Sequence, residues 1–191
     1  MNLKQELVQY YKWLRQYGLN DSHSGNASVR DGDTIWITPT GACADTLTEQ
    51  QLIACKTGQP AADGASLDAP LHLAVYQDNP QINAVLHCHG AYTVAMTMNG
   101  KDFVPFDFEG QFYFGRIPVI NLEFNDIFIK SAQLIAEELK TSKAAVVCGH
   151  GVYAAAESLN LAYKWSCSLE SSAKVAHIAH QAGTFPKHNG E

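Results

Sequence analysis

The sequence predicts a layered α/β domain. Segments in which apolar residues recur at helical spacing alternate along the chain with short strand-like runs, and this mixture is typical of helices packed against a sheet. The 191 residues, of which 46% are hydrophobic, can fill one core of ordinary size. No internal repeat, low-complexity tract or linker divides them. We therefore expect residues 1–191 to form a single domain.

The N-terminal part of the chain predicts a helix followed by a β-hairpin. Apolar residues at helical spacing from Leu3 to Leu14 indicate an amphipathic helix, which stops at Gly18. The runs 26–30 and 34–38 have the composition of strands and flank an Asp-Gly step, where glycine accepts the positive φ of a tight turn. We expect these two runs to pair.

The middle of the chain contains two helix-start signals. Residues 48–51 have the Thr-x-x-Gln form of a capping box, which predicts a short helix, and residues 53–56 are a candidate strand. Pro70 fits the first turn of a second helix, which Asp68 or Ala69 would cap. This second helix precedes the most informative strand of the sequence.

The second half of the chain predicts strands alternating with helices. The expected elements are a strand at 82–89, a helix at 92–98, a mostly extended aromatic stretch at 103–120, a helix from Asn125 to Leu139, a strand at 144–151 and a long helix from 158 to about 181. Proline and glycine interrupt the aromatic stretch, which argues against a helix there. Asn125 is a favoured N-cap residue, and Gly183 suits the end of the last helix.

The charge and cysteine content exclude several classes of protein. Thirteen basic and nineteen acidic residues give a formal net charge of −6, and the basic residues are scattered, so we expect small-molecule chemistry rather than nucleic-acid binding. The N-terminus lacks the apolar stretch of a signal peptide, and no run is long enough to span a membrane. Five cysteines without a C-x-x-C pair indicate reduced thiols. We expect a cytoplasmic protein.

Three histidines form a candidate metal site. His87 and His89 lie two apart at the end of a predicted strand, so their side chains point to the same face. His150 closes another apolar strand, between Gly149 and Gly151, which permit close approach of the backbone. Three imidazoles leave one coordination position open, as in catalytic zinc sites. The alternative is that the paired histidines are hydrogen-bonded core or surface residues.

Asp68 has two compatible interpretations. An aspartate just before Pro70 is a typical N-cap, whose carboxylate accepts hydrogen bonds from backbone N–H groups. A capping carboxylate is also held rigidly and can present its other oxygen to a metal or a substrate proton. His72, four residues further on, shares that helix face and is expected to support the site or pack rather than ligate.

Three short turns are candidates for binding an anion. They are S-G-N at 24–26, T-P-T-G at 38–41 and the segment around Ser66, whose N–H groups and hydroxyls can surround a phosphate. Ordinary turn chemistry also explains each of them, because Gly, Asn and Pro are the residues that turns require.

Taken in order, five motifs resemble the class II aldolase/adducin family over roughly residues 20 to 180. They are S-G-N-A-S-V-R, I-T-P-T-G, S-L-D-A-P-L-H-L-A-V-Y, A-V-L-H-C-H and V-C-G-H-G-V. The resemblance implies a three-layer α/β/α sandwich with a central mixed, largely antiparallel sheet. It also implies a homotetramer with active sites at subunit boundaries.

The resemblance also implies roles for individual residues. In the family the H-x-H pair and the later histidine bind zinc, which corresponds to His87, His89 and His150. The acidic residue of the family site corresponds to Asp68. The residues implied to bind the substrate phosphate are Gly25, Asn26, Thr40, Gly41 and Ser66.

The activity implied is that of a zinc-dependent aldolase, which cleaves a small ketose phosphate through a metal-stabilised enediolate. The interval from His89 to His150 is similar to that of the fuculose-1-phosphate aldolase branch. Two departures keep alternatives open: Asp68 stands where aldolases usually have glutamate and epimerases aspartate, and Leu67 replaces a serine of the phosphate site. The alternatives are a sugar-phosphate 4-epimerase, dehydratase or decarboxylase, and more remotely a non-catalytic adducin-like scaffold.

Overall fold

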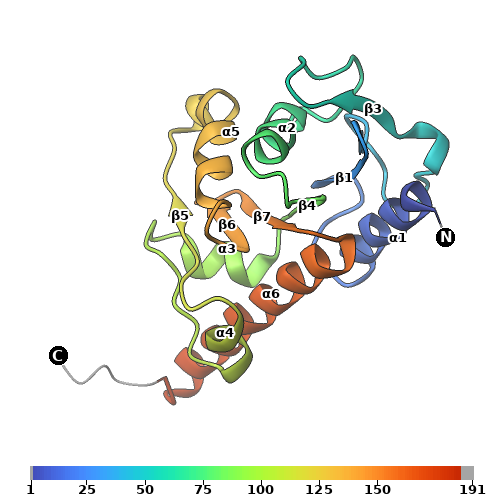
Figure 1. Cartoon of the computed structure of the whole chain (residues 1–191). Coiled ribbons are helices and arrows are strands. Elements are labelled where there is room, and N and C mark those ends of the chain that lie inside the picture. Colours follow the sequence, from blue (N-terminus) through green and yellow to red (C-terminus); the bar gives the residue numbers. More distant parts are fainter. Residues whose placement is uncertain (1, 186–191) are drawn as a thin grey trace.

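A seven-stranded mixed sheet forms the centre of the protein, with strand order β3-β2-β1-β4-β7-β6-β5 (Figure 1). The structure is a computed structural model that describes residues 2–185. Only the β5–β6 pair is parallel, so the prediction of a mixed, largely antiparallel sheet is confirmed. The strands are β1 Asn26–Asp31, β2 Thr34–Ile37, β3 Ile53–Lys56, β4 Ala84–Cys88, β5 Val119–Ile120, β6 Ala144–Val147 and β7 Gly151–Ala156.

Helices cover both faces of this sheet, which confirms the three-layer arrangement (Figure 1). The α2 and α5 helices pack against each other on one face, while α1 and α6 lie on the other, where α3 and α4 pack against α6. The helices are α1 Leu3–Gln16, α2 Ala69–Asp78, α3 Ala91–Thr97, α4 Phe108–Tyr113, α5 Ile127–Glu138 and α6 Leu159–Ala182.

Strand alternation divides the interior into two cores. In β4, Leu86 and Cys88 belong to the core under α1 and α6, whereas Val85 belongs to the core under α2 and α5. Successive side chains of a strand point to opposite faces, so His87 lies on the same face as Val85. The polar residues described below therefore lie on the α2 side of the sheet.

The N-terminal half agrees closely with the sequence prediction. The α1 helix has a capping box, in which the Gln5 N–H donates to the Asn2 side chain at 2.9 Å. Thr48 and Gln51 also form the expected capping box, although the element it begins is a single 3₁₀ turn, Glu49–Gln51. The β1–β2 hairpin pairs Asp31 with Thr34 around the predicted turn.

Three expectations for the second half were wrong in detail. The strand expected at 144–151 ends at Val147 as β6, because a tight turn follows, closed by the N–H of His150 donating to the carbonyl of Val147 at 3.0 Å. The chain then returns as a second strand, β7, which was not predicted from the sequence. The aromatic stretch is not mostly extended, because α4 forms within it with Asp107 as a side-chain N-cap. The α5 helix has Asp126, not Asn125, at its N-cap position, since a 3₁₀ turn precedes it.

Two further observations concern the helices and the cysteines of the described residues. Among the helices of the described residues, none combines the length and apolar character that crossing a bilayer requires. All five cysteines, which lie within residues 2–185, are free, in agreement with the absence of a disulfide pattern in the sequence.

Candidate active site

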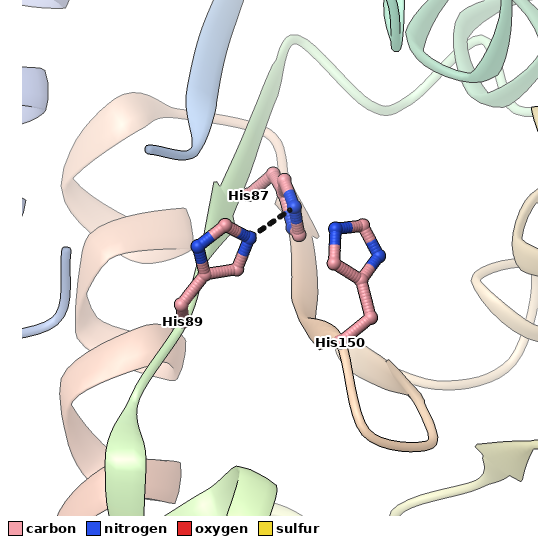
Figure 2. Close-up of side chains that lie close together, drawn as sticks. All are labelled: His87, His89 and His150. Carbon is pink, nitrogen blue, oxygen red and sulfur yellow. Dashed lines mark hydrogen bonds between the residues drawn. The ribbon is translucent and has the colours of Figure 1, made fainter. Parts of the chain in front are cut away.

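The rings of His87, His89 and His150 converge beside the end of β4 (Figure 2). His87 lies in β4 and His89 directly after it, while His150 comes from the β6–β7 turn. The Nε2 atoms of His87 and His89 lie 2.9 Å apart, and one ring nitrogen from each histidine lies within 4.8 Å of the others. The structure thus brings together the three histidines that were predicted from the sequence as metal ligands.

This cluster can hold a metal ion. The Nδ1 of His87 lies 2.9 Å from the carbonyl oxygen of Val152, so Nδ1 carries the proton and Nε2 faces the other rings with its lone pair. Nitrogens about 2.1 Å from one tetrahedral ion would lie roughly 3.4 Å apart, which falls within the range of separations in this cluster, from 2.9 Å to 4.8 Å. Within the described residues, the Nδ1 of His150 is buried without a hydrogen-bond partner, so no competing contact fixes that ring.

Gly151 is required for this convergence. A Cβ atom at position 151 would lie 2.5 Å from Cδ2 of His89 and 2.8 Å from Cε1 of His87. Any side chain there would push both rings away, because real Cβ contacts are essentially never so short. The prediction that this glycine permits close approach is confirmed by the packing.

Burial keeps the three rings neutral. Desolvation lowers the pKa of His87 well below its ordinary value, although Asp68 opposes the shift. The pKa values of His89 and His150 are also lowered, again chiefly by burial. Neutral imidazole is the form that ligates metals, so the cluster is ready to bind a cation near neutral pH.

Asp68 occupies the N-cap position of α2, but its side chain does not cap the helix. The capping interpretation was therefore wrong for the carboxylate, which turns toward the sheet. Its Oδ2 accepts hydrogen bonds from Asn26 Nδ2 at 2.8 Å and from the Tyr153 hydroxyl at 3.0 Å, and lies 3.7 Å from His87 Nε2. Burial disfavours the charged carboxylate, but His87 and these hydrogen bonds lower the pKa of Asp68 below its ordinary value.

A cavity of about 220 Å³ opens beside the histidine cluster and Asp68. Every residue implied to bind a phosphate contributes to its wall: Gly25, Asn26, Thr40, Gly41 and Ser66. Leu67 also lines the cavity and is 71% exposed, so an apolar side chain stands at its edge. Three turns far apart in the sequence therefore meet the candidate metal ligands around one volume.

A sequence model of the family described as Class II Aldolase and Adducin N-terminal domain matches residues 5–177. The chain belongs to this family. The match includes all nine predicted site residues and extends well beyond the motifs quoted above.

Within the class II aldolase/adducin family, the chain is similar to two kinds of enzyme. It is 28% identical over 155 residues to an L-fuculose phosphate aldolase of Methanococcus maripaludis, covering 81% of this chain and 84% of that protein. It is also 28% identical over 186 residues to a 3-oxo-tetronate 4-phosphate decarboxylase of Escherichia coli, covering 93% of this chain and 87% of that protein. The names of both relatives describe enzymes that act on phosphorylated compounds.

Solved structures agree with the family assignment. The L-fuculose-1-phosphate aldolase of Thermus thermophilus superposes with a TM-score of 0.88 at 28% identity, covering 97% of this chain and 98% of that one. The fold is thus the class II aldolase fold over nearly its whole length.

Sequence reasoning missed Tyr153, which contacts two of the predicted site residues. Its ring stacks on His87 with centroids 4.0 Å apart and an interplanar angle of 6°, and its hydroxyl donates to Asp68. The strand register explains the contact, because Asn26, His87 and Tyr153 lie side by side across β1, β4 and β7. Recognising the turn at His150 would have revealed β7, and alternation would then have placed Tyr153 on this face.

Proposed function

We propose that this protein is a zinc-dependent class II aldolase that cleaves a small ketose phosphate of the fuculose-1-phosphate type. The supporting observation is that three neutral imidazoles, one carboxylate, and hydroxyl-bearing and glycine-containing turns all line one shared cavity. Family membership supports an enzymatic role, since the two relatives named above are an aldolase and a decarboxylase of phosphorylated compounds.

His87, His89 and His150 would hold the ion and leave a position open toward the cavity. A divalent ion bound there would supply Lewis-acid stabilisation of the negative charge that develops on the substrate during carbon–carbon cleavage. His87 is almost fully buried, so water is excluded from its side of the cluster, and electrostatic interactions are stronger there than in water.

Asp68 would take the proton of a substrate hydroxyl group. Its Oδ2 already accepts two hydrogen bonds, whereas Oδ1 accepts none from the described residues and is the oxygen available to a substrate hydroxyl. Since its pKa is lowered, the carboxylate is charged at neutral pH and can act as a general base. Aldol cleavage needs such a base to take the proton of the hydroxyl beside the breaking bond.

The turns that line the cavity would bind the phosphate. Thr40 and Ser66 offer hydroxyl groups, and Gly25 and Gly41 permit a close approach to the backbone. Gly25 has φ +69, and a Cβ there would lie 2.5 Å from the carbonyl oxygen of His87, so this turn accepts only glycine. Leu67 supplies no hydroxyl, which leaves this subsite with fewer donors than the family pattern has.

Decarboxylation is the second candidate reaction. The decarboxylase relative aligns with 93% of the chain, a larger share than the aldolase relative covers. Epimerisation and dehydration are further alternatives of the same family, and Asp68 is the acid that the epimerases carry. In all four reactions negative charge develops on the substrate, and a cation held by the three histidines would stabilise it. Aldol cleavage, epimerisation and dehydration also need a base, whereas decarboxylation needs only an acid that protonates the carbon after carbon dioxide has left.

We also propose that the 191 residues form one cytoplasmic domain that assembles as a homotetramer, without nucleic-acid or membrane partners. Support for assembly comes from large apolar side chains that are mostly exposed in the single chain: Phe108, Phe112, Phe124 and Ile129. Light scattering of the purified protein tests this directly, and a monomer at micromolar concentration would contradict it.

One experiment separates the candidate activities. The zinc-loaded protein is incubated with a panel of ketose phosphates, ketoses and keto acid phosphates, and the products are identified by mass spectrometry and by NMR, which distinguishes epimers of equal mass. Dihydroxyacetone phosphate indicates the aldolase, carbon dioxide the decarboxylase and an inverted sugar the epimerase. Asp68→Asn is the control, since it should abolish turnover while zinc remains bound. A chain that takes up no divalent ion would support the adducin-like scaffold instead.

A further inference from the structure

A continuous line of buried polar groups leads from the core to Asp68. Tyr76, Ser28 and His72 are fully or almost fully buried, and Asn26 is 7% exposed at the edge of the cavity. The Tyr76 hydroxyl lies 2.8 Å from Ser28 Oγ, which lies 2.6 Å from His72 Nδ1. His72 Nε2 in turn lies 2.6 Å from Asn26 Oδ1.

The spacing of α2 against β1 produces this line. Asp68, His72 and Tyr76 recur every four residues on one helix face, at about 6 Å of rise. Asn26 and Ser28 recur every two residues on one strand face, at about 6.8 Å. Because these two spacings along α2 and β1 are nearly equal, the side chains of the helix alternate with those of the strand. Each side chain is therefore within hydrogen-bond distance of the next one in the line.

The direction of every hydrogen bond follows from the carboxylate at the end. A charged Asp68 can only accept, so Asn26 must present its Nδ2–H to it and its Oδ1 to His72. His72 must then carry its proton on Nε2, and its bare Nδ1 must accept from the Ser28 hydroxyl. Burial lowers the pKa of His72 to about 4, in keeping with a neutral ring.

We propose that His72 is a positioning residue that acts through Asn26 to fix the Asp68 carboxylate. Asn26 and Tyr153 hold Oδ2, so Oδ1 is the oxygen left to face the substrate. Asn26 is thereby engaged at both ends of its amide, and in this chain it orients the base. The inference rests on the proposed function only in naming Asp68 as the base.

The simplest alternative is that His72 merely fills space. A residue that only packs can be replaced by an apolar residue of similar volume without moving its neighbours. A positioning residue cannot, because His72→Leu leaves Asn26 Oδ1 buried and unpaired, and the amide then turns to find another donor. His72→Gln differs, since its amide N–H₂ can reach the place of Nε2 and keep the donor to Asn26.

Two readouts independent of activity test the proposal on the zinc-loaded protein. Long-range ¹H–¹⁵N NMR of histidine-labelled protein should find His72 neutral with its proton on Nε2. Crystal structures should show the Asn26 amide and the Asp68 carboxylate reoriented in His72→Leu and unchanged in His72→Gln. A proton on Nδ1, or an unmoved Asp68 in His72→Leu, would overturn the proposal even if no substrate has been found.

The kinetic test uses whichever substrate the product panel identifies. Turnover should fall on the order of 10- to 100-fold in His72→Leu, with KM changed less than about threefold, and His72→Gln should recover most of it. A rise in KM alone, or equal losses of turnover in both variants, would contradict a positioning role.

Ser28→Ala extends the test if His72→Leu fails to fold. It removes the donor to His72 Nδ1, so the preference for the Nε2–H form should weaken in the NMR spectrum. Ser166→Ala is the matched control, because Ser166 is equally buried but donates within α6, to the carbonyl of Ala162. If both variants leave the His72 tautomer unchanged, the line of hydrogen bonds does not direct the ring.

Discussion

The two faces of the same strands differ sharply in what they carry. On the α1/α6 face, the buried side chains of β1, β4 and β7 are apolar or small, such as Ala27, Leu86 and Val152. On the α2 face, the same strands present Asn26, His87 and Tyr153 in one row. The apolar packing on the α1/α6 face thus stabilises these strands, while their α2 face also presents the polar side chains of the candidate active site. Substitutions on the two faces should therefore have separable effects on stability and on function.

The largest effect is expected from removing a candidate metal ligand. His89→Ala should lower zinc affinity by about 100-fold or more and turnover by about 1000-fold, because two imidazoles cannot hold the ion in an open tetrahedral site. His89 is only partly buried, so the melting temperature of the metal-free protein should change little. Metal analysis after dialysis and calorimetric melting check both parts. Zinc retained at one equivalent would contradict the assignment.

Leu86→Ala tests the opposite face of the same strand. Leu86 is fully buried, so truncation should lower the free energy of unfolding by about 2–5 kcal/mol. Zinc stoichiometry at 25 °C should stay at one, since the His87 face is unchanged. Urea unfolding and metal analysis give the two values. Loss of zinc together with stability would show that the faces are not separable.

The buried ring of His72 should make stability depend on pH. Its pKa falls from 6.5 in the unfolded chain to about 4 in the folded protein, because burial opposes the charged form. The unfolded state therefore binds the proton first, and stability present above pH 6.5 is lost as the pH falls toward 4. This loss is on the order of 3 kcal/mol for the single group.

His72→Gln removes the ring whose protonation would lower the stability between pH 6.5 and about 4. Urea unfolding at several pH values between about 7 and 4 should give a flatter curve for the variant than for the original protein. Parallel curves would show that the folded protein already protonates His72 in this range, against the neutral ring described above.

Tyr153→Phe should have the smallest effect. The ring would still stack on His87, but Asp68 would lose one hydrogen bond to its Oδ2. We expect about a tenfold loss of turnover, which corresponds to about 1.4 kcal/mol, with zinc binding retained. Steady-state kinetics and metal analysis measure these quantities. Loss of zinc would instead assign Tyr153 to holding the metal cluster.

The histidine cluster could be predicted because it rests on local rules. Strand alternation aligns His87 with His89, and glycines beside His150 mark a close approach. The contacts of Asp68 could not be predicted in this way. Its local sequence is that of a helix cap, and only the neighbouring strands show that Asn26 and Tyr153 attract the carboxylate instead.

The elements that were mispredicted have ordinary physical causes. The β7 strand is rich in alanine, which has low strand propensity, and its pairing with both β4 and β6 outweighs that preference. The α4 helix is a short segment between Pro105 and Gly115, held by the Asp107 cap and by packing on α6. The β7 strand depends on pairing with β4, and α4 depends on packing against α6. These partners are distant in the sequence, so the spacing of apolar residues within each segment does not predict the contacts.

The central claim is that three imidazoles share one divalent ion with a position left open. X-ray absorption spectroscopy of the zinc-loaded protein tests this most directly. The account predicts one zinc per chain with three nitrogen ligands at about 2.0–2.1 Å and remaining oxygen ligands. A spectrum with sulfur ligands, or a zinc shell that His150→Ala leaves unchanged, would contradict it.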